Sequence, residues 1–222
     1  RCSTGALLKA RGLDKRYRRG AERVHAVAGV DLALYPGELV ALVGPSGSGK
    51  SSLLGLLAGW EPPDAGELTW APAAGRAPGW SELATVPQAL GLLEDLTVRE
   101  NVALPVRLRL GRRRAGEGRT EELLGLFGLA ELADRSPSET SLGQQQRAAV
   151  ARALVLTPQL VLADEPSAHQ DAAWVHDVFA ALRQVVHDRG AACLVATHDP
   201  DALQFADRVL HLADGELTER EL

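Results

Sequence analysis

The sequence predicts an α/β fold with a mostly parallel sheet, helices on both faces of that sheet, and an all-helical insertion. Short, wholly apolar runs recur along the chain, as expected for strands buried on both faces of a parallel sheet. Helical patterns separate these runs, and buried strands that alternate with helices imply parallel pairing. A long central stretch contains helical segments and no convincing strand.

The first half of the chain carries the opening strands and a short helix. Residues 24–34 alternate apolar and polar side chains, which predicts a strand. Residues 39–43 are wholly apolar, as in a buried parallel strand. A glycine-rich turn follows, and the pattern then predicts a helix over residues 50–58, which Gly59 and two prolines end.

The second half repeats the alternation of buried strands and helices. Further strands are predicted over residues 160–163, 191–197 and 209–212, and helices over residues 143–156 and 172–187. Asp214 and Gly215 stand between apolar runs and predict a hairpin turn.

Residues 96–138 form the predicted all-helical insertion. Its loop at residues 110–119 is rich in glycine and arginine. Two interpretations are open: a basic patch for lipid headgroups or RNA, or a solvated loop tip. The acidic balance of the whole chain favours the solvated tip.

Length and composition limit the class of protein. The chain has 222 residues, of which 45% are hydrophobic and 24% are charged, so disordered, collagen-like and disulfide-scaffold classes are excluded. The net charge of -5 argues against a dedicated nucleic-acid binder. At about 150 residues per domain, we expect one domain over residues 1–222.

No apolar run approaches the roughly 20 residues that cross a bilayer, and residues 1–9 lack the apolar core of a signal peptide. The cysteines, Cys2 and Cys193, do not form a spaced set. Cys193 lies in an apolar run and is interpreted as a small core residue, which fits a reducing cytosol.

A phosphate-binding loop is predicted where the pattern G-x-x-x-x-G-K-[ST] occurs. Its residues are Gly44, Pro45, Ser46, Gly47, Ser48, Gly49, Lys50 and Ser51, and Ser52 is counted with the nucleotide-binding residues. Glycines let successive N–H groups surround phosphates, and the following helix presents its N-terminus to them. Lys50 is expected to reach the β- and γ-phosphates, and the Ser51 hydroxyl to ligate Mg²⁺. The alternative, an accidental glycine-rich turn, explains neither the preceding buried strand nor the following helix.

Two carboxylates end the predicted strand at residues 160–163. Asp164 and Glu165 would lie at its carboxyl end, where open α/β sheets bind ligands. Asp164 is expected to hold Mg²⁺ through water, and Glu165 to orient and activate the attacking water. Alone, such a run is usually a strand that meets solvent, but the phosphate loop upstream makes the catalytic interpretation strong.

The chain resembles the nucleotide-binding subunit of an ABC transporter over nearly its whole length. Tyr17 matches the aromatic that stacks on adenine, and Gln88 the glutamine that joins the core to the helical insertion. Residues 141–147 (SLGQQQR) resemble the family signature, residues 167–171 the loop that crosses a dimer interface, and His198 the histidine at the γ-phosphate. Singly, these residues could be an edge-strand aromatic, a strand-end glutamine and a loop histidine, but their joint order favours the family.

The resemblance implies a P-loop core, an N-terminal antiparallel β-subdomain, and a helical subdomain at residues 96–156 that includes the signature helix. ATP and Mg²⁺ are implied to bind between two chains in a head-to-tail dimer. Each site would take Lys50, Ser51, Gln88, Asp164, Glu165 and His198 from one chain, and Ser141, Gly143 and Gln144 from the other. The implied catalytic residues are Glu165, His198, Gln88 and Lys50, and the implied metal ligands are Ser51, Gln88 and Asp164.

Three positions, in two motifs, depart from the family pattern. Leu142 replaces the first glycine of L-S-G-G-Q, and Thr140 replaces its leucine. Leu142 either holds the partner's site open, since a side chain adds bulk beside phosphate, or turns away into the helical subdomain. Gln170 replaces the apolar residue usual before Asp171. The departures imply slowed catalysis or a different, intact partner subunit.

Within the family, the chain is most similar to the branch of macrolide exporters, lipoprotein-release complexes and cell-division ATPases. This implies a bacterial ATPase at the cytoplasmic face of the inner membrane that acts on a separate transmembrane permease through a groove beside residues 88–95. The second chain is a like copy or a different subunit. The alternatives are a soluble ABC ATPase that acts on a macromolecule and a weakly catalytic ATP-binding scaffold. A nucleoside kinase or GTPase is disfavoured because neither explains Gln88, the signature and His198 together.

Overall fold

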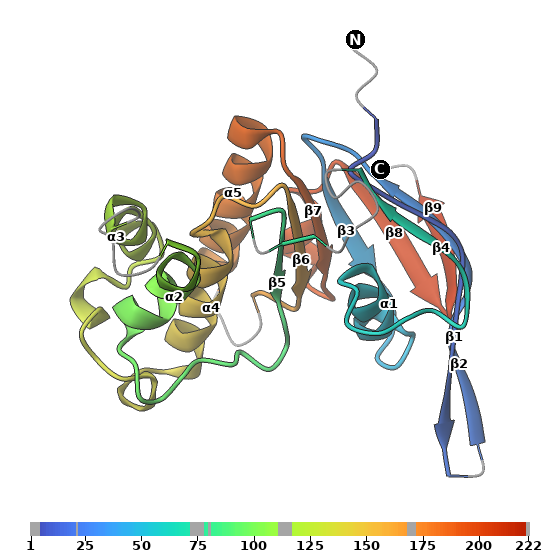
Figure 1. Ribbon diagram of the computed structural model, residues 1–222, viewed down its shortest axis with the longest axis horizontal. Coiled ribbons are helices and arrows are strands. Elements are labelled where there is room, and N and C mark those ends of the chain that lie inside the picture. The colour runs from blue at the N-terminus through green and yellow to red at the C-terminus, as the bar shows by residue number, and fades with distance from the viewer. Residues whose placement is uncertain are drawn as a thin grey trace.

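A six-stranded sheet runs through the centre of the molecule in the order β5-β6-β7-β3-β8-β9 (Figure 1). The structure is a computed structural model that describes residues 5–20, 22–71, 78–79, 81–110, 117–167 and 172–220. The strands are β3 (Leu39–Val43), β5 (Leu83–Val86), β6 (Leu160–Asp164), β7 (Ala192–Ala196), β8 (Arg208–Ala213) and β9 (Glu216–Arg220). All neighbours pair in parallel except β8 and β9, which form the hairpin predicted at Asp214-Gly215.

A second, three-stranded sheet is antiparallel, in the order β2-β1-β4. Its strands are β1 (Leu8–Arg19), β2 (Glu22–Leu34) and β4 (Ala65–Trp70). The hairpin of β1 and β2 extends beyond the rest of the chain in Figure 1. The predicted N-terminal antiparallel β-subdomain is confirmed, although only β2 was expected as a particular strand.

The helices are α1 (Lys50–Leu57), α2 (Val98–Leu110), α3 (Glu117–Leu126), α4 (Leu142–Leu154), α5 (Ala172–Arg189) and α6 (Pro200–Leu203). Two 3₁₀ turns, η2 (Ala130–Leu132) and η3 (Pro137–Glu139), lie between α3 and α4. The described part of the central region contains no strand, as predicted. The predicted loop at residues 110–119 is too long: α2 continues through Leu110 and α3 begins at Glu117, while residues 111–116 lie outside the described residues.

The first turn of α4 is fixed by its own side chains. The hydroxyl of Ser141 accepts a hydrogen bond from the N–H of Gln144 at 3.3 Å, and the Gln144 side chain accepts one from the Ser141 N–H at 2.8 Å. This reciprocal capping box satisfies two of the N–H groups left free at a helix start. The helix therefore begins at Leu142, one residue before the predicted start, and ends two residues before the predicted end.

Apolar side chains pack on both faces of the large sheet. Leu39 and Ala41 of β3 point into a cluster shared with α4, α5 and the central helices, and Val40 and Leu42 point into a cluster shared with α1 and the antiparallel sheet. Figure 1 shows α1 between the two sheets and α2 and α3 beyond α4. This period-two alternation buries both faces of the strands, as predicted.

Cys193 is fully buried in this core, where burial raises its pKa to about 12, so the core assignment of this cysteine is confirmed. Cys2 lies outside the described residues. None of the helices in the described ranges is both long and apolar enough to span a membrane.

Candidate nucleotide-binding site

One pocket of about 1220 Å³ gathers most of the residues singled out from the sequence. The predicted residues that line it are Tyr17, Gly44, Pro45, Ser46, Gly47, Gly49, Lys50, Ser51, Ser52, Gln88, Asp164, Glu165 and His198. Ser48 is buried and does not line it, and neither do Ser141, Gly143 and Gln144. Val24, Ala26, Gln146, Ser167, Asp199 and Pro200 complete the wall and were not predicted to contact nucleotide.

The phosphate loop joins the end of β3 to the start of α1. Two of its glycines are required by space: a Cβ atom at Gly49 would lie 1.9 Å from the Ala26 carbonyl oxygen, and one at Gly44 would lie 2.1 Å from that of Leu212. The helix begins without a side-chain cap on its N-terminal N–H groups. The first helical residues, KSSL, include no acidic side chain. These features leave positive helix-dipole charge facing the pocket, which suits an anion.

Lys50 lies within this loop. Its ammonium Nζ donates to the carbonyl oxygens of Gly44 at 2.7 Å and Pro45 at 3.1 Å. The charge is therefore held against the loop, where phosphate oxygens can exchange for these carbonyl partners.

The two carboxylates lie at the carboxyl end of β6, as predicted. Asp164 is the last residue of the strand, and Glu165 follows with a φ of 51°, in the left-handed region that non-glycine residues seldom adopt. The Glu165 N–H donates to the carbonyl of Ala196 at 2.9 Å, and the Glu165 carbonyl accepts from Gln146 Nε2 at 2.9 Å. Both main-chain groups of this unusual residue are thus held by neighbouring elements.

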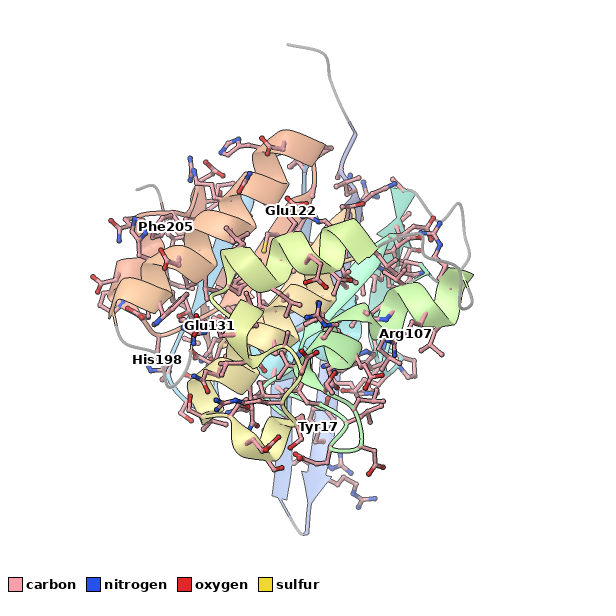
Figure 2. The ribbon with its side chains drawn as sticks, turned by 90° about the vertical axis from the view of Figure 1, so that its left-hand side faces the viewer. Tyr17, Arg107, Glu122, Glu131, His198 and Phe205 are labelled. Carbon is pink, nitrogen blue, oxygen red and sulfur yellow. The ribbon has the colours of Figure 1, made fainter. Side chains whose placement is uncertain are left out.

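Glu165 and His198 form a direct side-chain hydrogen bond, which is an ion pair when the imidazole is protonated. The His198 Nδ1 and Glu165 Oε1 atoms are 2.8 Å apart, with the carboxylate 16% exposed and the imidazole 78% exposed. Figure 2 places His198 at the surface of the molecule. The hydrogen bond to Glu165, and then its negative charge, raise the pKa of His198 above the usual 6.5, because both favour the imidazolium.

Tyr17 is positioned by Glu61, which is distant in the sequence, and by Lys15, two residues before it. Its hydroxyl donates to the carboxylate of Glu61, and the ammonium of Lys15 lies 5.7 Å from the centre of its ring. Partial burial raises the pKa of the Tyr17 hydroxyl, and the bond to Glu61 raises it further. Sequence reasoning missed Glu61, because no local pattern links it to Tyr17.

Ser141, Gly143 and Gln144 lie apart from the pocket, at the start of α4, whereas Gln146 of the same signature lines it. Leu142 is 48% exposed, so the helical region covers only about half of it. This half-exposure favours the alternative in which Leu142 holds the partner's site open, and the choice between the two alternatives stays a prediction. Ser167 is buried in the pocket wall, whereas residues 168–171, including Gln170 and Asp171, lie outside the described residues.

Comparison with known proteins identifies the family. The sequence profile of the ABC transporter family matches residues 27–168. This chain belongs to that family. As an ABC protein it is an ATP-binding ATPase, which confirms the activity and fold class expected from the sequence.

Relatives of this ABC ATPase match it over almost its full length. The lipoprotein-releasing system ATP-binding protein LolD 2 of Caulobacter vibrioides is 42% identical, and the match covers 95% of this chain and 96% of that protein. The protein of the same name, LolD, from Gluconobacter oxydans is also 42% identical, with 97% of each chain covered. The expected resemblance to the lipoprotein-release branch is thereby confirmed.

Solved structures agree with the fold. The ATP-binding cassette MJ0796, in a dimeric post-hydrolysis state bound to ADP and Pi, superposes with a TM-score of 0.87 at 30% identity. The superposition covers 97% of this ABC ATPase and all of the MJ0796 chain.

Proposed function

We propose that this chain is the ATP-hydrolysing subunit of a lipoprotein-releasing type of ABC complex, in which two ATP-binding chains close head to tail and drive a separate transmembrane permease. One observation carries the proposal. The pocket holds the phosphate loop, both carboxylates, Gln88 and His198, but the capped start of α4 lies outside it. This arrangement supports a role for Ser141, Gly143 and Gln144 at a pocket on another chain.

In this proposal Lys50 and the loop N–H groups bind the phosphates, and Tyr17 stacks on the adenine. Ser51, Gln88 and Asp164 offer a hydroxyl, an amide and a carboxylate oxygen in one pocket, which is the hard-oxygen chemistry that Mg²⁺ prefers. Among the described residues, no group of three or more His, Cys, Asp or Glu forms a metal site. These three donors would therefore hold Mg²⁺ together with phosphate oxygens and water, and the bound ion would neutralise phosphate charge.

Glu165 and His198 have complementary tasks in hydrolysis. The Glu165 carboxylate is an acceptor that can orient the attacking water and take its proton. His198 is paired with that carboxylate in this structure, and its raised pKa keeps it cationic more readily. A γ-phosphate would compete for the imidazolium, because it brings a larger negative charge. The exchange would release Glu165 to hold water only when nucleotide is present.

The partners follow from the same arrangement. Ser141, Gly143 and Gln144 of a second chain would contact the γ-phosphate with the positive end of α4. The second chain is a like copy or a related subunit. The permease would contact the groove beside residues 88–95, at the cytoplasmic face of the inner membrane. Residues 96–156 are proposed as the helical subdomain of one ABC ATPase domain spanning residues 1–222.

Phosphate release from the purified chain tests the catalytic part of this proposal. Glu165→Gln should keep ATP affinity and lose most turnover, since the amide cannot accept the proton of water. Glu131→Gln is the matched control, because Glu131 is exposed in the helical region that faces the viewer in Figure 2. Turnover of Glu165→Gln at the parental rate would contradict the assignment.

Co-purification in mild detergent from the source cell tests the proposed partner. It should recover a multi-span membrane protein, whereas recovery of ribosomes or DNA would support the soluble alternative.

A further inference from the structure

Gln146 is a polar side chain buried beside the catalytic carboxylate. It is 3% exposed and lies in the second turn of α4, and of the helix residues 142–154, all described, it alone lines the nucleotide pocket. Its Nε2 donates to the carbonyl oxygen of Glu165 at 2.9 Å. The Gln146 side chain therefore binds the main chain of Glu165, the residue proposed to orient water, and its amide donor is not directed at nucleotide.

The Glu165 peptide needs such support. A non-glycine residue with a φ of 51° persists only where surrounding contacts fix it. Ala196 of β7 accepts the Glu165 N–H, and Gln146 of α4 supplies a donor to its carbonyl. Together these two bonds determine the direction in which the Glu165 side chain leaves the backbone, and hence where the carboxylate meets water and His198.

The same helix also contacts the segment that follows Gln88. Arg152, nearly two turns further on, donates to the carbonyls of Leu90 at 2.5 Å and Gly91 at 2.6 Å, two and three residues after Gln88. At its start α4 presents Ser141 and Gly143. One helix thus joins the signature to the two segments of its own chain that carry Glu165 and Gln88.

We propose that Gln146 is a positioning residue for ATP hydrolysis. It holds the main chain of Glu165, so the orientation of the Glu165 carboxylate depends on the position of α4 in the same chain. The inference rests on the proposed role of Glu165. It implies that when the start of α4 binds the partner's nucleotide and the helix shifts, the orientation of the chain's own Glu165 carboxylate changes as well. The bond therefore links the two sites of the dimer through each chain as well as across the interface.

Substitution by methionine tests this role, because Gln146→Met keeps the length of the side chain and removes the N–H donor. We expect kcat to fall by about 10-fold to 100-fold, as for other small misplacements of catalytic groups. The Kd for ATP should stay within about twofold, since the phosphate loop is untouched. Gln204→Met is the matched control: Gln204 is exposed and also donates to a main-chain carbonyl, that of Asp201, so its loss should leave kcat unchanged.

A double-mutant cycle separates positioning from mere structure. If Gln146 acts through Glu165, adding Gln146→Met to Glu165→Gln should change the residual rate of radiolabelled phosphate release by less than about twofold. An equal fall in both backgrounds, or a Gln146→Met kcat equal to the parent's, would overturn the inference. Parental turnover by Glu165→Gln would instead defeat the proposed function on which it rests.

A second substitution covers the case in which methionine is not tolerated. Gln146→Leu also removes the donor and introduces no titratable group, so it should show the same loss of kcat with the same Kd for ATP. If neither variant folds, as judged by ATP binding and circular dichroism, Gln146 is a structural residue and the inference is overturned.

Discussion

At Glu165, a strained main chain and an ion-paired carboxylate meet in one residue. The main chain is held by Ala196 and Gln146, and the carboxylate by His198. Each of these contacts comes from a different element, so the position of the Glu165 carboxylate depends on β7, α4 and the loop after β7. Roles at the residue scale are thus set by long-range packing as much as by residue type.

The titration of His198 should report its contact with Glu165. Because the folded-state pKa is raised above 6.5, the pair stabilises the fold fully below pH 6.5 and loses that contribution as pH rises through the raised value. Proton NMR titration should give His198 a pKa above 6.5, and Glu165→Gln should lower it, since the principal causes of the shift are removed. Assignment of the signal by His198→Ala is the control. An unchanged pKa in Glu165→Gln would show that the two side chains do not pair in solution.

Replacing Lys50 and replacing Tyr17 should lower the affinity for nucleotide by different amounts. Lys50→Ala removes a charge from the phosphates and should abolish most ATP binding. Tyr17→Ala removes base stacking and should weaken ATP and GTP alike by roughly 1–3 kcal/mol. Tyr17→Phe keeps the ring but loses the bond to Glu61, so its loss should be smaller than that of alanine. Isothermal titration calorimetry measures all three, and parental affinity in Tyr17→Ala would make the aromatic purely structural.

At the scale of elements, α4 carries the main departure from the family. The capping box of Ser141 and Gln144 sets its start, and Leu142 projects from the first turn with 48% of its surface exposed. In the proposed two-chain site this end of α4 would approach the partner's phosphate, and an exposed leucine there would add bulk where close approach gives the helix N–H groups their effect.

Leu142→Gly should therefore raise steady-state ATPase activity and tighten ATP-driven dimerisation. Glycine in the first turn costs at most about 1 kcal/mol of helix stability, and the half-exposed leucine is not part of the buried core. The measurement is phosphate release from the assembled membrane complex, parent against variant. Leu126→Gly is the matched control, because Leu126 is another half-exposed leucine, at the end of α3. A Leu142→Gly variant no faster than the parent would reject the idea that Leu142 holds the site open.

The sequence predicted the buried elements best. The bounds of β3 and the start of α1 agree with prediction, because a doubly buried strand is a continuous apolar run and a phosphate loop marks the helix start. The strands β4 and β5 were missed because they are short and their side chains are mostly exposed or half-buried. The contacts of Gln146 with Glu165 and of Tyr17 with Glu61 were also missed, since each joins residues from separate elements without a local pattern.

At the scale of the whole molecule, the pocket and the start of α4 lie in different places. The pocket lies where the two sheets and α1 meet, and the start of α4 lies on the helical side of the large sheet. In the proposed two-chain site, a single chain would hold the parts of one site without assembling them. Closure of two chains on ATP would complete two sites at once, and opening after hydrolysis would supply the motion passed to a permease.

Light scattering coupled to size-exclusion chromatography of Glu165→Gln tests this central claim most directly. With saturating ATP and Mg²⁺, the variant should elute with twice the 23.6 kDa mass of one chain, because nucleotide is retained and carboxylate repulsion across the interface is removed. Without ATP, and in the Lys50→Ala Glu165→Gln double variant with ATP, the mass should be that of one chain. A mass of 23.6 kDa for Glu165→Gln at saturating ATP, with binding verified, would contradict the two-chain site.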